Sequence, residues 1–204
     1  MYAISDIHGH YDKLVELIEK ISPQKDDVFI FAGDYIDRGK HSCQVIEYLI
    51  EFSKQYKCIF LKGNHEDMFL HAYCGNELDK MIWKKNGGSK TIKSYKGSLK
   101  NIPFSHLQFF KNLQLYYEDE QYIIVHAGIV PNKPMEEQIP EDIMWIREEF
   151  INQPTGLSKK VIYGHTREQL VKNTFSDKIA IDTGVSAQGH LSAIKLPEEI
   201  FISV

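Results

Sequence analysis

The chain has 204 residues, of which 43% are hydrophobic and 25% are charged, the ordinary balance of a globular protein with a buried core. This composition excludes a fibrous or largely disordered chain, and no apolar run approaches the roughly 18 residues that a membrane span requires. The formal net charge is −4 and only three of the 24 basic residues are arginine, which disfavours a dedicated nucleic-acid-binding protein.

The first 75 residues alternate between short apolar runs and segments with helical periodicity. In the first helical segment, Leu14, Leu17 and Ile18 fall on one face. The alternation predicts strands at Tyr2–Ser5, Val28–Ala32 and Cys58–Leu61, and helices at Tyr11–Ile21, Ser42–Tyr56 and Glu66–Tyr73. A strand–helix alternation of this kind indicates an α/β layered fold.

The later part of the chain has a different pattern. A polar helical insert is predicted at about 78–112, interrupted by Asn86-Gly87-Gly88 and Pro103. One helix is predicted near Glu141–Phe150, and short strands are predicted at Tyr122–Val125, Val161–Tyr163, Ile179–Ile181, Leu191–Lys195 and Phe201–Val204. We expect these strands to form a second sheet packed on the first, giving a β-sandwich flanked by helices.

The sequence has no internal repeat and no Pro/Gly/Ser-rich linker, so we expect a single domain over residues 1–204. The first residues show no basic flank followed by an apolar segment, which predicts a cytoplasmic protein. The three cysteines are odd in number and lack metal-finger spacing, so they are expected to be ordinary cytosolic thiols: Cys43, Cys58 and Cys74.

Five loops that follow predicted strands carry residues suited to bind metal or phosphate. Three of them are Asp6-Ile7-His8-Gly9, Gly33-Asp34-Tyr35-Ile36-Asp37-Arg38-Gly39 and Gly63-Asn64-His65-Glu66. Two later loops are His126-Ala127-Gly128 and Gly164-His165-Thr166. Ligands bind at the C-terminal ends of adjacent strands in α/β sheets, so these loops should converge. One such loop would be weak evidence, whereas five in one chain indicate a common site.

The residue types in these loops fit a site for two metal ions. Asp6 and His8 are two residues apart in a segment expected to be extended, which would place both side chains on one side to share a cation. The two oxygens of Asp34 can bridge two cations. Further donors are available from Asn64, His126 and His165. This mixture of carboxylate, imidazole and amide ligands suits Mn²⁺, Fe or Zn²⁺ better than Ca²⁺ or a thiolate-bound zinc.

Three other loop residues are suited to act on a phosphate group. Two ions at roughly 3.5–4 Å would hold a hydroxide between them and neutralise phosphoryl oxygens. Arg38, beside Asp34 in a chain with few arginines, is expected to recognise phosphate in a bidentate manner. His65 adjoins Asn64 and is expected to act as general acid, with Asp37 as the partner that orients it.

In their order along the chain, these blocks resemble the phosphoprotein phosphatases of the calcineurin-like metallophosphoesterase superfamily. The resemblance extends from Asp6 to Thr166 and is closest to the bacterial and phage branch typified by bacteriophage lambda phosphatase. Asn86-Gly87-Gly88 and Trp145-Ile146-Arg147-Glu148 resemble the helical-insert and second-arginine motifs of that branch. The family pattern commonly has proline at the positions of Lys40 and Arg167, and both replacements add positive charge near the expected mouth of the site.

The resemblance implies a fold and a division of the site residues. The fold is a β-sandwich of two mixed sheets flanked by helices. Arg38 and Arg147 would hold phosphate, His65 would be the acid and Asp37 its partner. One of two divalent metal ions would be held by Asp6, His8 and Asp34, and the other by Asp34, Asn64, His126 and His165. Mn²⁺ is the expected metal, with Fe or Zn²⁺ as alternatives.

The expected function is that of a metal-dependent phosphomonoesterase, first a serine/threonine or dual-specificity protein phosphatase. The alternative is a symmetrical dinucleoside polyphosphate (diadenosine tetraphosphate) hydrolase, which shares the His126–Ile129 block, or another nucleotide phosphatase. A third hypothesis, from a different class, is a catalytically silent binding module, but every expected ligand and acid position is filled. The expected partner is a phosphoprotein or a phosphorylated small molecule, with no membrane and no nucleic acid.

Overall fold

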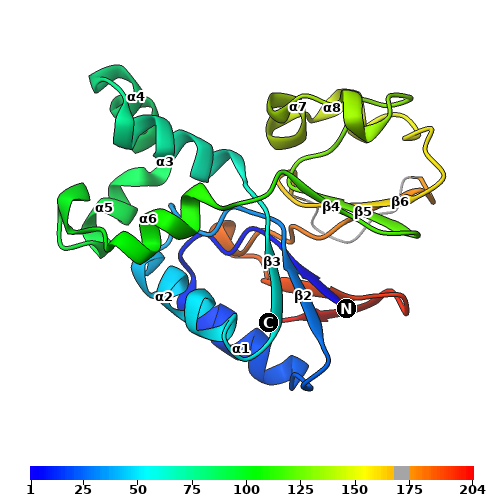
Figure 1. Cartoon of the computed structure of the whole chain (residues 1–204), viewed down its shortest axis with the longest axis horizontal. Coiled ribbons are helices and arrows are strands. Elements are labelled where there is room, and N and C mark those ends of the chain that lie inside the picture. The colour runs from blue at the N-terminus through cyan, green and yellow to red at the C-terminus, as the bar shows by residue number, and fades with distance from the viewer. Residues whose placement is uncertain (168–174) are drawn as a thin grey trace.

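Two β-sheets pack face to face between two groups of helices in the computed structural model, which describes residues 1–167 and 175–204 (Figure 1). The first sheet has the strand order β3-β2-β1-β8-β9. Its strands are β1 (Tyr2–Ile4), β2 (Val28–Phe31), β3 (Lys57–Phe60), β8 (Ser192–Lys195) and β9 (Ile200–Ser203). β1, β2 and β3 are parallel, whereas β8 is antiparallel to both β1 and β9.

The second sheet has the strand order β4-β5-β6-β7. Its strands are β4 (Tyr116–Glu118), β5 (Tyr122–Val125), β6 (Lys160–Tyr163) and β7 (Lys178–Ala180). β4 is antiparallel to β5, and the other neighbours are parallel. Both sheets are therefore mixed, and the expected β-sandwich flanked by helices is confirmed.

Alternation along the strands divides the core into layers. On β1, Ala3 faces the second sheet, where it packs with residues such as Ile124 and Ile162. Its neighbours Tyr2 and Ile4 face the opposite way, into a cluster formed with the helices. Successive side chains of a strand point to opposite faces, so a short apolar strand that is buried on both sides contributes side chains to both layers of the core.

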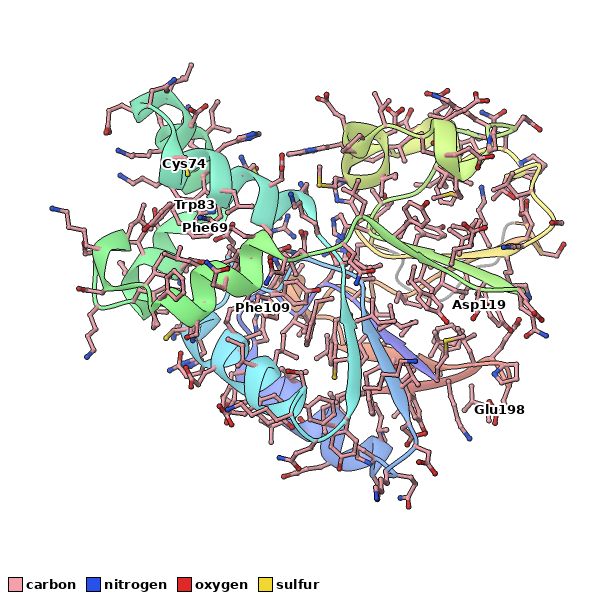
Figure 2. All side chains as sticks on the ribbon, in the orientation of Figure 1. Phe69, Cys74, Trp83, Phe109, Asp119 and Glu198 are labelled. Carbon is pink, nitrogen blue, oxygen red and sulfur yellow. The ribbon has the colours of Figure 1, made fainter. Side chains whose placement is uncertain are left out.

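Helices cover the outer faces of both sheets (Figure 1). α1 (Tyr11–Ile21) and α2 (Ser42–Phe52) contribute to the core cluster of the first sheet. The chain between β3 and β4 forms α3 (Asn64–Cys74), α4 (Glu77–Trp83), a π-helical segment (Lys84–Gly88), α5 (Ser89–Ser94), a 3₁₀ turn (Leu99–Asn101) and α6 (Phe104–Lys111). The rings of Phe69 and Trp83 lie 5.4 Å apart within this group (Figure 2).

α7 (Pro140–Trp145) and α8 (Glu148–Ile151) lie over the second sheet, where Ile143 and Phe150 join its core cluster. Two further 3₁₀ turns occur at Met135–Glu137 and Val185–Ala187. Among the described residues, no helix is long and apolar enough to cross a membrane.

The structure corrects several sequence-based expectations. The last two predicted strands belong to the first sheet, because β8 pairs with β1 instead of with the strands that precede it. β4 was not expected. The helix expected near Glu141–Phe150 is two short helices, because ψ at Ile146 is 144° and the backbone at Arg147 is also non-helical. α2 ends at Phe52, earlier than Tyr56.

Candidate metal centre

The sequence-predicted metal-binding residues come together at the C-terminal ends of five strands. Asp6 and His8 follow β1, Asp34 follows β2, Asn64 follows β3, His126 follows β5 and His165 follows β6. All six side chains are buried, with at most 7% of their surface exposed. Both sheets thus contribute side chains to one site, as parallel strands ending at the same edge permit.

The backbone of these loops adopts conformations that non-glycine residues seldom use. Asp6, His8, Asp34 and His165 all have positive φ angles, between 47° and 62°. The expected extended segment at Asp6–His8 was therefore wrong: left-handed turns, not strand alternation, direct both side chains into the site. Such conformations cost about 1–3 kcal/mol each and cluster at functional sites.

Close approach of the loops depends on glycine. A Cβ atom at Gly63 would overlap Asp34 Oδ1, and one at Gly164 would overlap Ser5 Oγ and Asp6 Oδ1. The glycines that flank the motifs therefore leave room for the carboxylates to lie directly against neighbouring backbone.

Hydrogen bonds determine which nitrogen of two histidines faces the site. His8 Nδ1 lies 2.9 Å from the carbonyl oxygen of Ile36, and His126 Nδ1 lies 2.9 Å from that of Ala32. A carbonyl oxygen only accepts, so both Nδ1 atoms carry the proton and both Nε2 atoms present a lone pair. Both rings thus direct an unprotonated nitrogen into the site, as a neutral imidazole that binds a metal ion must.

The carboxylate of Asp34 lies between these two histidines. Its Oδ2 is 3.4 Å from His8 Nε2, and its Oδ1 is 3.4 Å from His126 Nε2. Asp6 Oδ2 lies 3.8 Å from the same His8 nitrogen. Each oxygen of Asp34 therefore faces a different half of the site, which is the arrangement that a carboxylate bridging two cations requires.

The second half of the site is also rich in electron-pair donors. His126 Nε2 lies 3.1 Å from Asn64 Oδ1 and 3.2 Å from His165 Nδ1, and His165 Nε2 is buried with no hydrogen-bond partner among the described residues. The Asn64 amide oxygen faces only acceptors, so a metal-free site would favour the opposite amide orientation, with NH₂ toward Asp34 and the histidines. A cation bound between these side chains would instead favour the orientation in which the Asn64 amide oxygen faces the site.

Charge and burial in the site also fit cations. Burial lowers the pKa of His8 to about 3 and that of His165 to about 2, so these imidazoles are neutral at neutral pH. Burial and the charge of Asp34 raise the pKa of Asp6 to about 7, and burial and the charge of Asp6 raise that of Asp182 to about 8. Crowded buried carboxylates with neutral imidazoles form a site that bound cations would stabilise.

Two overlapping groups could hold a metal ion among the described residues. One is His8, Asp34 and His65, and the other is Asp34, His126 and His165; within each, the candidate ligand atoms lie within 4.8 Å of one another. Asp34 belongs to both groups. By distance alone His65 is a possible ligand, whereas the sequence indicated Asp6 for that position and an acid role for His65.

His65 is held in a chain of hydrogen bonds. Its Nδ1 lies 2.7 Å from Asp37 Oδ2, which leaves Nε2 directed to the site, 3.0 Å from Arg38 Nη2. Arg38 Nη1 lies 2.9 Å from His8 Nε2, so the guanidinium spans both rings. Burial alone would lower the pKa of His65, but the charge of Asp34 and the bond to Asp37 outweigh it and raise that pKa.

Arg147 lies in the junction between α7 and α8, next to the loop that carries His165. Its Nη1 donates to the carbonyl oxygen of His165 and to Thr166 Oγ1, both at 3.3 Å. The adjacent Trp145 is 40% exposed, and its ring lies 6.2 Å from that of His165. The structure therefore places Arg147 beside the His165 loop.

Sequence reasoning missed three buried residues that support the site. Glu66 accepts hydrogen bonds from the backbone N–H groups of Asp34, Tyr35 and Gly63 at 2.8–3.1 Å, and so ties two loops together. Its position after Asn64 and His65 was the available signal. Trp83 Nε1 and Thr91 Oγ1 donate to the carboxylate of Asp37 at 2.8 and 2.6 Å. No local sequence pattern connects Trp83 and Thr91 with Asp37, which lies about 50 positions earlier in the chain.

The chain is similar to known phosphoesterases. A family model described as calcineurin-like phosphoesterase matches residues 1–190. The chain is 26% identical to the asymmetrical bis(5′-nucleosyl)-tetraphosphatase PrpE of Oceanobacillus iheyensis, over 98% of this chain and 90% of that protein. It is 27% identical to serine/threonine-protein phosphatase 2 of Escherichia coli, over 96% of this chain and 92% of that protein.

Solved structures with a similar fold were also found. A crystal structure provisionally described as a diadenosine tetraphosphatase superposes with a TM-score of 0.78 at 20% identity, covering 100% of this chain and 91% of that one. A cold-active protein-tyrosine phosphatase from a Shewanella species superposes with a TM-score of 0.67 at 16% identity, covering 99% of this chain and 79% of that one.

Proposed function

The chain belongs to the calcineurin-like phosphoesterase family, and we propose that it is a metal-dependent phosphatase whose two ions share Asp34. The observation that carries this proposal is the position of the Asp34 carboxylate, whose two oxygens each lie 3.4 Å from the unprotonated nitrogen of a different histidine. In this proposal Asp6 and His8 complete one ion site, and the other is completed by Asn64, His126 and His165.

The metal ions, when bound, would supply an activated water and neutralise the phosphoryl oxygens. Arg38 would turn its guanidinium from the two histidine nitrogens that it now contacts toward two oxygens of the phosphoryl group. Arg147 would contact the same group. Both arginines keep their charge throughout, so they stabilise the transition state without a proton transfer.

His65 is proposed to donate a proton to the oxygen that leaves with the rest of the substrate. Asp37 accepts from Nδ1 at 2.7 Å, and Nε2, which faces the site, accepts from Arg38 in this structure. Once Arg38 has turned to the phosphoryl group and the ring is protonated, Nε2 would carry the proton that is donated. A departing serine or threonine alkoxide needs this proton. A departing nitrophenolate or nucleotide phosphate needs it much less, because each is a weak base.

Two substrate classes fit this chemistry, phosphorylated serine or threonine side chains and dinucleoside polyphosphates. The two relatives reported above differ in this respect, since PrpE is described as a tetraphosphatase and the Escherichia coli relative as a serine/threonine-protein phosphatase. The proposal of a metal-dependent phosphatase applies to both. The two classes can be separated by comparing kcat/KM for a phosphoserine peptide, a phosphotyrosine peptide and diadenosine tetraphosphate under identical Mn²⁺.

Removal and restoration of metal test the proposal itself. The chelated protein is expected to lose turnover of p-nitrophenyl phosphate and to regain it with Mn²⁺, with two ions bound per chain by elemental analysis. Asp34→Asn is expected to bind fewer ions and to lose at least about a hundredfold in kcat, because the shared ligand is removed. Asp67→Asn, a carboxylate on α3 that contacts Lys62 and His71, is the matched control. Full activity without metal would refute the proposal.

A further inference from the structure

A pocket of about 410 Å³ adjoins the metal centre on the side of Arg38. It is formed by the start of α1, by the loop that runs from Arg38 to the start of α2, and by Lys90 on α5. We call it the basic pocket. Its volume lies within the range of small-molecule sites, about 300–1,000 Å³. Three segments that are distant in sequence therefore line one open pocket beside the candidate metal centre.

The lining of the basic pocket is strongly cationic. Four of its side chains are cations and one is a carboxylate, in a chain whose formal net charge is −4: Lys13, Arg38, Lys40, Lys90 and Asp12. Lys13 pairs with Glu16 at 2.8 Å. No ion pair neutralises Lys40 or Lys90 within the described part of the chain. The concentrated charge favours an anionic occupant.

Arg38 belongs to both the basic pocket and the metal centre. Its guanidinium contacts His8 and His65 at 2.9 and 3.0 Å, and the same residue lines the pocket. The loop that continues to Lys40 and His41 is held against the first motif, because the backbone N–H of Gly39 donates to His8 O and that of His41 donates to Gly9 O. An anion in the pocket would therefore lie next to a phosphoryl group at the metal centre.

We propose that the basic pocket binds a second phosphoryl group of the substrate, so that this enzyme favours substrates with a polyphosphate chain. The inference rests on the proposed function, which places the first phosphoryl group beside Arg38. In a polyphosphate, neighbouring phosphoryl groups share one oxygen atom, so two of them fit on either side of a single arginine. An acidic residue of a phosphopeptide is separated from the phosphate by side chain and backbone, and fits a hollow this close to the centre less well.

Charge-removing variants test the basic pocket. Lys40→Gln, Lys90→Gln and the double variant are compared with Lys93→Gln, which removes an exposed lysine of the same helix α5 that does not line the pocket. For each Mn²⁺-loaded protein, kcat/KM is measured on diadenosine tetraphosphate, on p-nitrophenyl phosphate and on phosphoserine peptides with neutral or acidic flanking residues.

Each pocket variant is expected to lose about tenfold in kcat/KM on diadenosine tetraphosphate, and the double variant more, because each lysine supplies a charge-assisted contact. Losses on p-nitrophenyl phosphate should be far smaller, and Lys93→Gln should resemble wild type. Equal losses on both substrates, no loss on the tetraphosphate, or a selective loss on the acidic phosphopeptide would each overturn the inference.

A binding measurement separates this inference from the proposed function. Calorimetry with inorganic tripolyphosphate should show tighter binding than with orthophosphate, and the Lys40→Gln/Lys90→Gln protein should lose that difference. If the wild-type protein showed no metal-dependent turnover but retained this lysine-dependent binding, the proposed function would be refuted, whereas anion binding by the basic pocket would be confirmed. If the wild-type protein bound the two anions with equal affinity, the proposed role of the basic pocket would be refuted, whether or not the protein showed phosphatase activity.

Discussion

The hydrogen bond from Trp83 to Asp37 offers a sharp test of how the helices between β3 and β4 serve the site. Trp83 Nε1 donates at 2.8 Å to Asp37 Oδ2, the same oxygen that lies 2.7 Å from His65 Nδ1. Trp83 is fully buried, and a Cβ at Gly88 would press against its indole ring. Trp83→Phe keeps an aromatic ring in this position but removes the N–H, so Asp37 and then His65 should be held less firmly.

The expected cost has two parts. A hydrogen bond to a charged group contributes roughly 1.5–3 kcal/mol to stability, and the smaller ring leaves a partly filled space that costs roughly 1 kcal/mol. The free energy of unfolding should therefore fall by about 3 kcal/mol. For a chain of this length that is a decrease in Tm of about 6–12 °C. If His65 is the acid, kcat on a phosphoserine peptide should fall about tenfold and kcat on p-nitrophenyl phosphate much less.

The assay combines thermal unfolding, bound metal and kcat on both substrates. Phe110→Leu is the control, since it removes a buried ring that packs 4.6 Å from Phe69 in the same helical group and has no hydrogen bond to Asp37. It should lower Tm without changing the ratio of the two kcat values. If Trp83→Phe also left that ratio unchanged, Trp83 would be a core residue only, and its role in positioning the Asp37–His65 pair would be disproved.

Two further predictions concern the proposed reaction. His65→Asn should keep both metal ions but lose about 10²–10⁴-fold in kcat on a phosphoserine peptide, with a smaller deficit on p-nitrophenyl phosphate; equal deficits would argue against the acid role. Arg38→Ala and Arg147→Ala should each lower kcat/KM by about ten- to a hundredfold and weaken inhibition by vanadate, with little rescue by lysine because a point charge cannot replace a bidentate contact. If Arg147→Ala behaved like the wild type while Arg38→Ala lost activity, Arg147 would not contact the phosphoryl group.

Local patterns in the sequence were enough to predict most of the strands and the loops that carry the candidate ligands. Apolar runs such as Val28–Ala32 and the glycine-flanked motifs around Asp34 and His126 depend on nearby residues only, because strand alternation and tight turns are properties of a few consecutive positions. The position of these motifs directly after predicted strands predicted that the loops would converge. The structure brings them together at the ends of β1, β2, β3, β5 and β6.

Sequence reasoning failed where the outcome depended on backbone detail or on partners far along the chain. Asp6 and His8 reach the site through positive φ angles of 56° and 47°, a strain that only the surrounding packing can hold in place. β8 completes the first sheet by pairing with β1, about 190 residues away. No local pattern distinguishes this pairing from pairing with the preceding strands.

By itself, then, the sequence determined that this is a layered α/β protein with carboxylate, amide and imidazole donors at its strand ends. Only the tertiary structure decided that the two oxygens of Asp34 face different histidines, that Trp83 and Thr91 hold Asp37, and that Lys90 joins Lys40 in one pocket. The physical reason is that a turn or a strand is stabilised by neighbours in sequence, whereas a binding site is formed by side chains that meet only when distant segments pack together.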